Sequence, residues 1–116
     1  MKISTKLVVA LFVCSLVASA IVEADHIQST DPDWSELTAS MDKMHMTMGA
    51  VARSGNSDVD FVRLMLPHHQ AAIDMAKTQL LYGKDPQMRR LAQEIITDQQ
   101  LEIELMQRWL KQQQVN

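Results

Sequence analysis

The run from Phe61 to Ala76 constrains the fold of this chain more than any other stretch. Its pattern is helical, yet it contains a proline and two adjacent histidines, Pro67, His68 and His69. Each residue of an α-helix advances by about 100°. One stripe of the helix therefore holds Phe61, Leu64, Met65, His68, Ala72 and Met75, with His69 at its edge. Thioether and imidazole groups consequently face the same way.

Three helix starts divide the chain. The capping residues are Asp31 before Pro32, Ser57 or Asp58, and Asp85 before Pro86. Gly55 and Gly83 are typical of helix ends. We therefore expect helices over residues 32 to 52 or 53, from 57 or 58 to 82, and 86 to 113. No alternating strand pattern occurs, so the sequence predicts an all-α, antiparallel three-helix bundle.

The first residues have the order of a secretory signal peptide. Lys2 and Lys6 precede an apolar run over residues 7–17, and small residues follow. Cleavage after Ala20 and cleavage after Ala24 both fit. The apolar run is shorter than the roughly 20 residues of a membrane span, which favours cleavage over anchoring. The expected organisation is a signal peptide over 1–24, a flexible lead over 25–31 and a helical domain over 32–116, in a periplasmic or secreted protein.

Cysteine and charge exclude several classes of function. Cys14 is the only cysteine and lies inside the apolar run, so the mature chain should have no disulfide, zinc ribbon or thiol nucleophile. The formal net charge is −3 and no basic patch is visible, which argues against a nucleic-acid partner. Any chemistry with soft metals would fall to the nine methionines.

Methionine and histidine recur together in the first expected helix. Met41, Met44, His45 and Met48 are spaced at i, i+3, i+4 and i+7, where helix side chains converge. Met46 points away from them. Thioethers prefer Cu(I) or Ag(I), and imidazole also suits copper, so this set favours monovalent copper. The alternative is packing, because methionine also fills irregular cores.

The sequence leaves the roles of the other candidate ligands open. Neighbouring residues diverge by about 100° on a helix, so we expect one of His68 and His69 to bind metal and the other to brace it. The sequence does not say which. Gln99 and Glu102 interrupt the apolar stripe of the third helix. They either form hydrogen bonds to helix ends or orient a histidine ligand.

Enzyme motifs are missing from the sequence. No glutamate is followed three residues later by histidine, as a di-iron bundle requires. There is also no His-Glu-x-x-His, phosphate-binding glycine loop or nucleophile elbow. We therefore expect a binding protein rather than an enzyme, and a redox enzyme is the weakest alternative.

Several segments together resemble a known family. They are the run from Met65 to Ala76, Gly83, Arg90 to Ala92, Ile95 and Ile96, Gln99 to Ile103, Met106, Trp109 and Leu110, with Met41-x-x-Met44-His45 upstream. This pattern resembles the "domain of unknown function 305" family of bacterial exported proteins. The resemblance implies a ferritin-like helical bundle, a periplasmic address and, for members with an assigned role, copper binding and resistance. It nominates as ligands Met44, His45, Met48, Met65, His68, His69 and Met75.

The combined expectation is an exported protein that holds Cu(I), or Ag(I), between the first two helices and sequesters it or passes it to an unknown acceptor. Such a bundle has four helices and this chain supplies three, so a homodimer would complete it. The rival hypothesis is a metal-free interaction module with a methionine-rich docking face.

Overall fold

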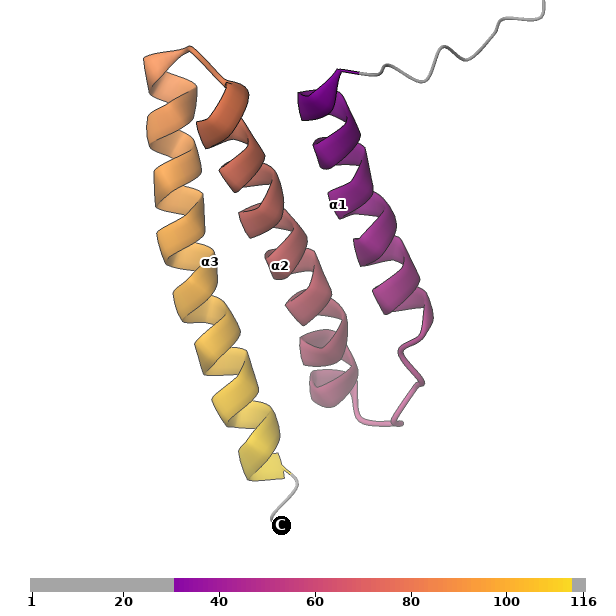
Figure 1. The fold of residues 1–116 in the computed structure, drawn as a ribbon. Coiled ribbons are helices and arrows are strands. Elements are labelled where there is room, and N and C mark those ends of the chain that lie inside the picture. Colours follow the sequence, from indigo (N-terminus) through magenta and orange to yellow (C-terminus); the bar gives the residue numbers. More distant parts are fainter. Residues whose placement is uncertain (1–30, 114–116) are drawn as a thin grey trace, which may run out of the picture.

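The computed structural model describes residues 31–113, which form three helices and contain no strand. The helices are α1 (Pro32–Gly49), α2 (Ser57–Tyr82) and α3 (Pro86–Gln113). Consecutive helices run in opposite directions (Figure 1). The all-α, three-helix prediction is thus confirmed. The predicted signal peptide, both cleavage positions and the lead before Asp31 lie outside the described residues.

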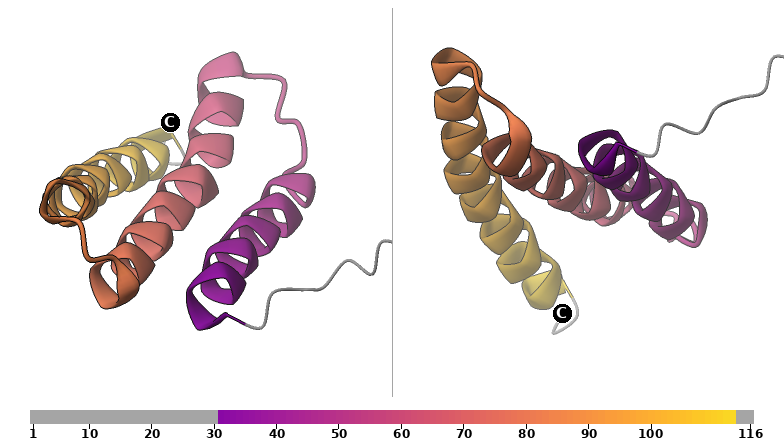
Figure 2. Two further views of the ribbon diagram at one scale, coloured as in Figure 1. Left: turned by 90° about the horizontal axis from the view of Figure 1, so that it is seen from above. Right: turned by 45° about the horizontal axis from the view of Figure 1, so that its top comes forward.

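The middle helix holds the arrangement together. α2 lies between α1 and α3 in each view of the ribbon (Figures 1 and 2) and packs against both. α1 and α3 do not pack against each other. The three helices therefore form an open layer, in which one long side of α2 has no helix to cover it.

The first helix is shorter than predicted. The sequence suggested an end at residue 52 or 53, whereas α1 ends at Gly49. The Ala50 amide is shared between the carbonyls of Met46 and Thr47 at 3.2 Å, and the Val51 amide donates to the Met48 carbonyl at 3.1 Å. These bonds tighten the last turn and use up its free carbonyls, so the helix stops there. Gly55 then turns the chain with a φ of 87°.

The cap of α2 also differs from the prediction. The sequence predicted Ser57 or Asp58 as the cap, but the Asn56 side chain caps the helix, accepting from the amides of Asp58 at 3.0 Å and Val59 at 3.2 Å. Asparagine is as good an N-cap as aspartate or serine, and its position one residue earlier decides the choice. The predicted cap of α3 is confirmed, since the Asp85 carboxylate accepts from the amides of Gln87 and Met88.

The apolar core lies between α2 and α3. Its buried members are Val62 and Ile73 from α2 and Ile103 and Met106 from α3. α1 has no buried residue. It is joined to α2 instead by polar contacts: Glu36 accepts from Thr78 at 3.2 Å and from Tyr82 at 3.0 Å.

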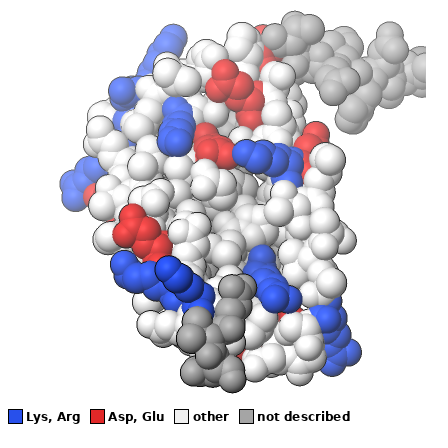
Figure 3. All heavy atoms as spheres, turned by 60° about the horizontal axis from the view of Figure 1, so that its bottom comes forward, with Lys and Arg blue, Asp and Glu red and all other residues white. Residues whose placement is uncertain are grey.

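The charged groups of the described chain are mixed rather than segregated. On the face drawn in Figure 3, acidic and basic side chains lie among uncharged atoms and beside one another. None of the three described helices is long and apolar enough to cross a membrane.

Candidate metal-binding face

The uncovered side of the layer contains an apolar groove, which we call the open face. The groove has a volume of about 350 Å³ and receives side chains from all three helices. Its lining residues are Leu37, Ala72, Met75, Ala76, Gln79, Met88, Leu91, Ala92 and Ile95. None of them is charged.

The predicted stripe of α2 faces this side. Ala72 and Met75 line the groove, and His68 precedes them by four and seven residues, one and two helical turns. His68 is exposed, and no hydrogen bond or ion pair engages its ring within residues 31–113. Met65 lies one turn earlier and is half-buried, partly against the α2–α3 core. The stripe therefore offers one unengaged imidazole with a thioether on either side.

The methionines of α1 follow the same side. Leu37 lines the groove, and Met41, Met44 and Met48 come 4, 7 and 11 residues later, on the same face of the helix. Met41 is 42% exposed, while Met44 and Met48 are half-buried. These three thioethers and the α2 stripe thus border one open surface.

His45 lies at the edge of the open face, and Met46 lies on another side of α1. His45 is exposed and no hydrogen bond engages its ring in the described part of the chain. Its helical position places it at the outer edge of the open face. Met46 is 77% exposed on another side of the helix, where the spacing predicted it.

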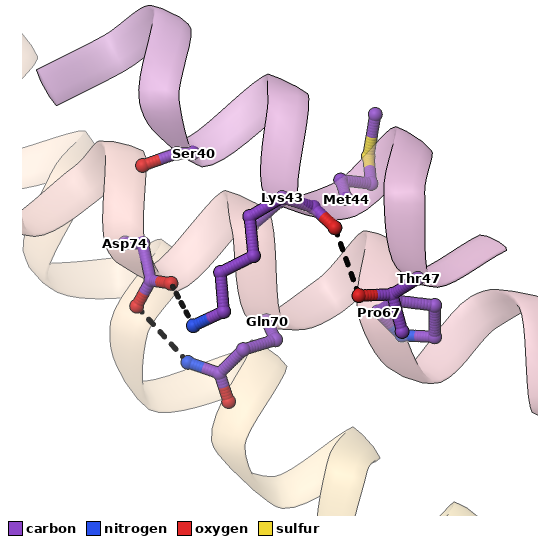
Figure 4. A pocket seen from close by; sticks show the side chains of 8 residues that line it. Ser40, Lys43, Met44, Thr47, Pro67, Gln70 and Asp74 are labelled. Carbon is purple, nitrogen blue, oxygen red and sulfur yellow. Dashed lines mark hydrogen bonds and ion pairs between the residues drawn. The ribbon is translucent and has the colours of Figure 1, made fainter. Parts of the chain in front are cut away.

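The seam between α1 and α2 beside Met44 is polar. A hollow of about 140 Å³ there is lined by Met44 and Pro67 together with Lys43, Gln70 and Asp74. The Lys43 ammonium lies 3.9 Å from the Asp74 carboxylate, which also accepts from the Gln70 amide at 3.0 Å (Figure 4). The Met44 thioether extends away from this ion pair (Figure 4). The charged groups therefore leave it available.

His69 is oriented away from the groove, toward α3. Its Nε2 lies 2.5 Å from Glu102 Oε2, and its Nδ1 lies 2.9 Å from the Met65 carbonyl oxygen. The Met65 carbonyl can only accept, so the Nδ1–H group donates to it, while Nε2 faces the Glu102 carboxyl group. Both ring nitrogens of His69 are therefore engaged by the protein.

The two histidines diverge as the helical spacing predicted. Their ring centroids are 6.2 Å apart with planes tilted by 60°. His68 is the unengaged member of the pair and His69 the anchored one. Of the two polar residues singled out in α3, Glu102 is the carboxylate that holds His69, while Gln99 is half-buried three residues before it.

The donor set is soft. Within residues 31–113 no group of three or more histidine, cysteine, aspartate or glutamate side chains is placed to hold a metal ion. Hard cations need clustered oxygen ligands. The donors that share the open face are thioethers and a single imidazole from each of α1 and α2.

Sequence reasoning missed the polar bonds that hold α1. Glu36 lies off the apolar stripe of α1, so hydrophobic spacing gives it no role. The pKa of the Tyr82 phenol is raised, chiefly by its hydrogen bond to Glu36 and further by burial and by the negative charge of the Glu36 carboxylate. The available signal was the placement of Glu36, Ser40 and Lys43 on one side of α1, facing the polar edge of α2.

A hydrogen bond also holds the loop between α1 and α2. The Asp60 carboxylate accepts from the Ser54 backbone amide at 2.7 Å. Hydrogen bonds from the Ser54 side chain and backbone lower the pKa of Asp60. The loop that joins α1 to α2 is thereby tied to the first turn of α2.

Comparison with known proteins identifies the family. No curated protein matches the chain. One family model, described as "Domain of unknown function (DUF305)", matches residues 16–110, which include all three helices except the last residues of α3. The match covers most of the sequence, and its limits enclose every candidate ligand. The chain therefore belongs to the DUF305 family.

Proposed function

We propose that this chain is an exported protein, periplasmic or secreted, that binds Cu(I), or Ag(I), through methionine and histidine side chains. The observation that carries the proposal is that Leu37 of α1 and Met75 of α2 line one groove. Helical spacing puts Met41, Met44 and Met48 on the Leu37 face of α1, and Met65 and His68 on the Met75 stripe of α2. The protein would sequester the ion or pass it on, and so contribute to copper homeostasis or resistance.

The chemistry of these donors favours a monovalent soft ion. Thioethers are neutral, so they bind without losing a proton, and they select Cu(I) over harder cations. Imidazole ligation requires a neutral ring. His68 is exposed and unengaged, so it meets that requirement without breaking another contact.

The role of His69 follows from its two contacts. Because Glu102 and the Met65 carbonyl hold its ring, it would brace α2 against α3 rather than bind the ion. This fixes the rotation of α2 about its axis and thereby the direction in which His68 points. We thus assign metal binding to His68 and positioning to His69 and Glu102.

No catalysis is part of the proposal. An ion bound at the rim of the open face can be exchanged with another carrier whenever that face is uncovered. The ferritin-like, four-helix character that the family resemblance implies would require an additional helix over this face. Transfer would then compete with whatever covers it.

The test is a titration of metal-free protein with Cu(I) against a competing chromogenic chelator. Replacing Met41, Met44 and Met48 together by leucine keeps the apolar volume but removes three donors, and we expect Cu(I) affinity to fall by at least tenfold. Met46→Leu is the matched control, because Met46 lies on the same helix but away from the open face. Equal affinity of the triple variant and the control would overturn the assignment to α1.

A second pair of variants separates the two histidines. We expect His68→Ala to weaken Cu(I) binding and His69→Ala to change mainly the stability of the fold. Affinity measured at a temperature where both variants are fully folded decides between them. A larger loss of affinity from His69→Ala would reverse the assignment.

The alternative function is a metal-free interaction module. The observation in its favour is the set of large apolar side chains left exposed, Trp34, Phe61 and Leu91 among them. Thermal denaturation discriminates the two functions. A ligand at 100 times its dissociation constant stabilises the fold by about 2.7 kcal/mol, so a copper protein should show a clear rise in Tm with Cu(I) and an interaction module should not.

A further inference from the structure

The open face has a shape that can pair with itself. The groove lies over the C-terminal half of α2, where Met75 and Leu91 line it. On the same stripe, the N-terminal half of α2 presents Phe61, 60% exposed, and Leu64, 37% exposed. Phe61 also borders a separate hollow with Leu105 and Trp109 of α3. One end of the face therefore carries an exposed aromatic ring and the other carries the groove.

Helical spacing places these two ends symmetrically. Phe61 precedes His68 by seven residues and Met75 follows it by seven, which is roughly 10 Å in each direction along the axis. If two copies of α2 lie antiparallel with His68 at the centre, Phe61 of each copy lies over the groove beside Met75 of the other. This reciprocal relation is the one that a two-fold symmetric interface requires.

The exposed apolar area agrees with a dimer interface. Trp34, Met41, Phe61, Leu64, Met88 and Leu91 are each between 37% and 60% exposed. Together they leave roughly 400 Å² of apolar surface uncovered. A standard interface buries about 800 Å² on each partner, of which a little more than half is apolar. These six side chains therefore supply most of what a stable dimer needs.

Charge is compatible with self-association through the groove. The residues that line the groove are uncharged, so an identical surface can approach without repulsion at the contact. The opposite side of the α1–α2 seam carries Glu36, Lys43 and Asp74. Burying that side against a second copy would take these charged groups out of water, which costs free energy.

We infer that the open face is the contact surface of a symmetric homodimer, with the two-fold axis passing near His68. The pairing does not depend on copper. Only its corollary rests on the proposed function: the two His68 rings and their flanking thioethers would meet at the axis, where one ion could be held by both copies.

The test is sedimentation equilibrium of the exported chain, freed of metal by a chelator. We expect a dimer for the unaltered protein and at least a tenfold weaker association for Leu91→Glu, which puts a charge in the groove. Leu81→Glu is the matched control, because Leu81 is 71% exposed and lines a hollow on the other side of α2. Circular dichroism of both variants establishes that they remain helical.

A cysteine at the axis tests the geometry directly. In a chain that lacks Cys14, His68→Cys should form a disulfide-linked dimer under mild oxidation, and Leu81→Cys should not. A monomeric unaltered protein, equal disruption by Leu81→Glu, or binding of the monomer to lipid vesicles through Leu91 would each overturn the proposal. Because no metal is present, failure here leaves the copper titrations unaffected.

Discussion

His69 on α2 and Glu102 on α3 are joined by a contact of 2.5 Å between Nε2 and Oε2, across 33 residues of sequence. The Met65 carbonyl holds the other ring nitrogen, so the imidazole is fixed at both ends. This pair is the only ion pair between α2 and α3 in the part of the chain that the structure describes.

We expect Glu102→Gln to lower the free energy of unfolding by roughly 0.5–1 kcal/mol. The effect is modest because the Glu102 side chain is 54% exposed and solvent screens the pair. Urea denaturation of Glu102→Gln, His69→Gln and the double variant gives the coupling energy directly. Strictly additive losses would show that the two residues act independently.

Alkaline pH should loosen the α1–α2 contact. The pKa of Tyr82 is raised by its hydrogen bond to Glu36, so the neutral phenol is favoured in the folded state. Its contribution is complete below the ordinary tyrosine pKa of about 10 and is lost as pH rises through the higher folded value. At neutral pH the free energy of unfolding of the unaltered protein should therefore exceed that of Tyr82→Phe. At strongly alkaline pH the two values should come closer together. A difference that stayed constant with pH would contradict this account.

Acid should act at the loop before α2. The pKa of Asp60 is lowered by hydrogen bonds from Ser54, so the carboxylate is favoured in the folded state. Its contribution is present above the ordinary aspartate value and disappears as pH falls through the lower folded value. We expect Asp60→Asn to be destabilised relative to the unaltered protein at neutral pH and to match it more closely in acid. Proteolysis at the loop, compared at the two pH values, measures the difference.

Two glycines should respond oppositely to alanine. A Cβ at Gly83 would lie 2.5 Å from the Gln79 carbonyl oxygen and closer still to the end of the Gln79 side chain, so Gly83→Ala should cost about 1–3 kcal/mol. A Cβ at Gly49 meets nothing within 4 Å. Gly49→Ala should stabilise the fold by about 0.5–1 kcal/mol, because glycine loses more backbone entropy in a helix. Midpoints of thermal unfolding check both signs.

Copper affinity should fall little in mild acid if thioethers dominate the site. Methionine sulfur has no proton to lose, whereas a histidine-only site must compete with ring protonation. Chelator competition at neutral pH and near pH 5 should therefore give a small change for the unaltered protein. A steep loss would shift the assignment toward His45 and His68.

The sequence predicted the helices more accurately than their mutual placement. Caps and glycines located the start of α3 and the end of α2, because these signals depend on residues within a turn of each other. α1 ended three or four residues early, where the carbonyls of Met46, Thr47 and Met48 were satisfied by a tighter turn. The hydrophobic periodicity of the sequence does not show where such a tighter turn will replace the helix.

For the candidate site, too, the sequence predicted positions within each helix but not the contacts between helices. Helical spacing placed the methionines and His68 on common stripes, and it separated His68 from His69. It could not tell which neighbour each stripe faces, so the anchoring of His69 to Glu102 was only one of two interpretations. The sequence also could not predict that α1 and α3 do not pack against each other, because hydrophobic periodicity describes single helices. The ligand roles themselves stay predictions.

The lack of any buried side chain in α1 has a kinetic consequence. A helix held by Glu36, Lys43 and a few half-buried methionines can detach at a lower free energy than the α2–α3 pair needs to separate. Backbone amides of α1 should thus exchange with deuterium well before those around Ile73 and Ile103. Such detachment would move the methionines of α1 away from those of α2. The proposed Cu(I) ion would then have a route out that does not require the protein to unfold.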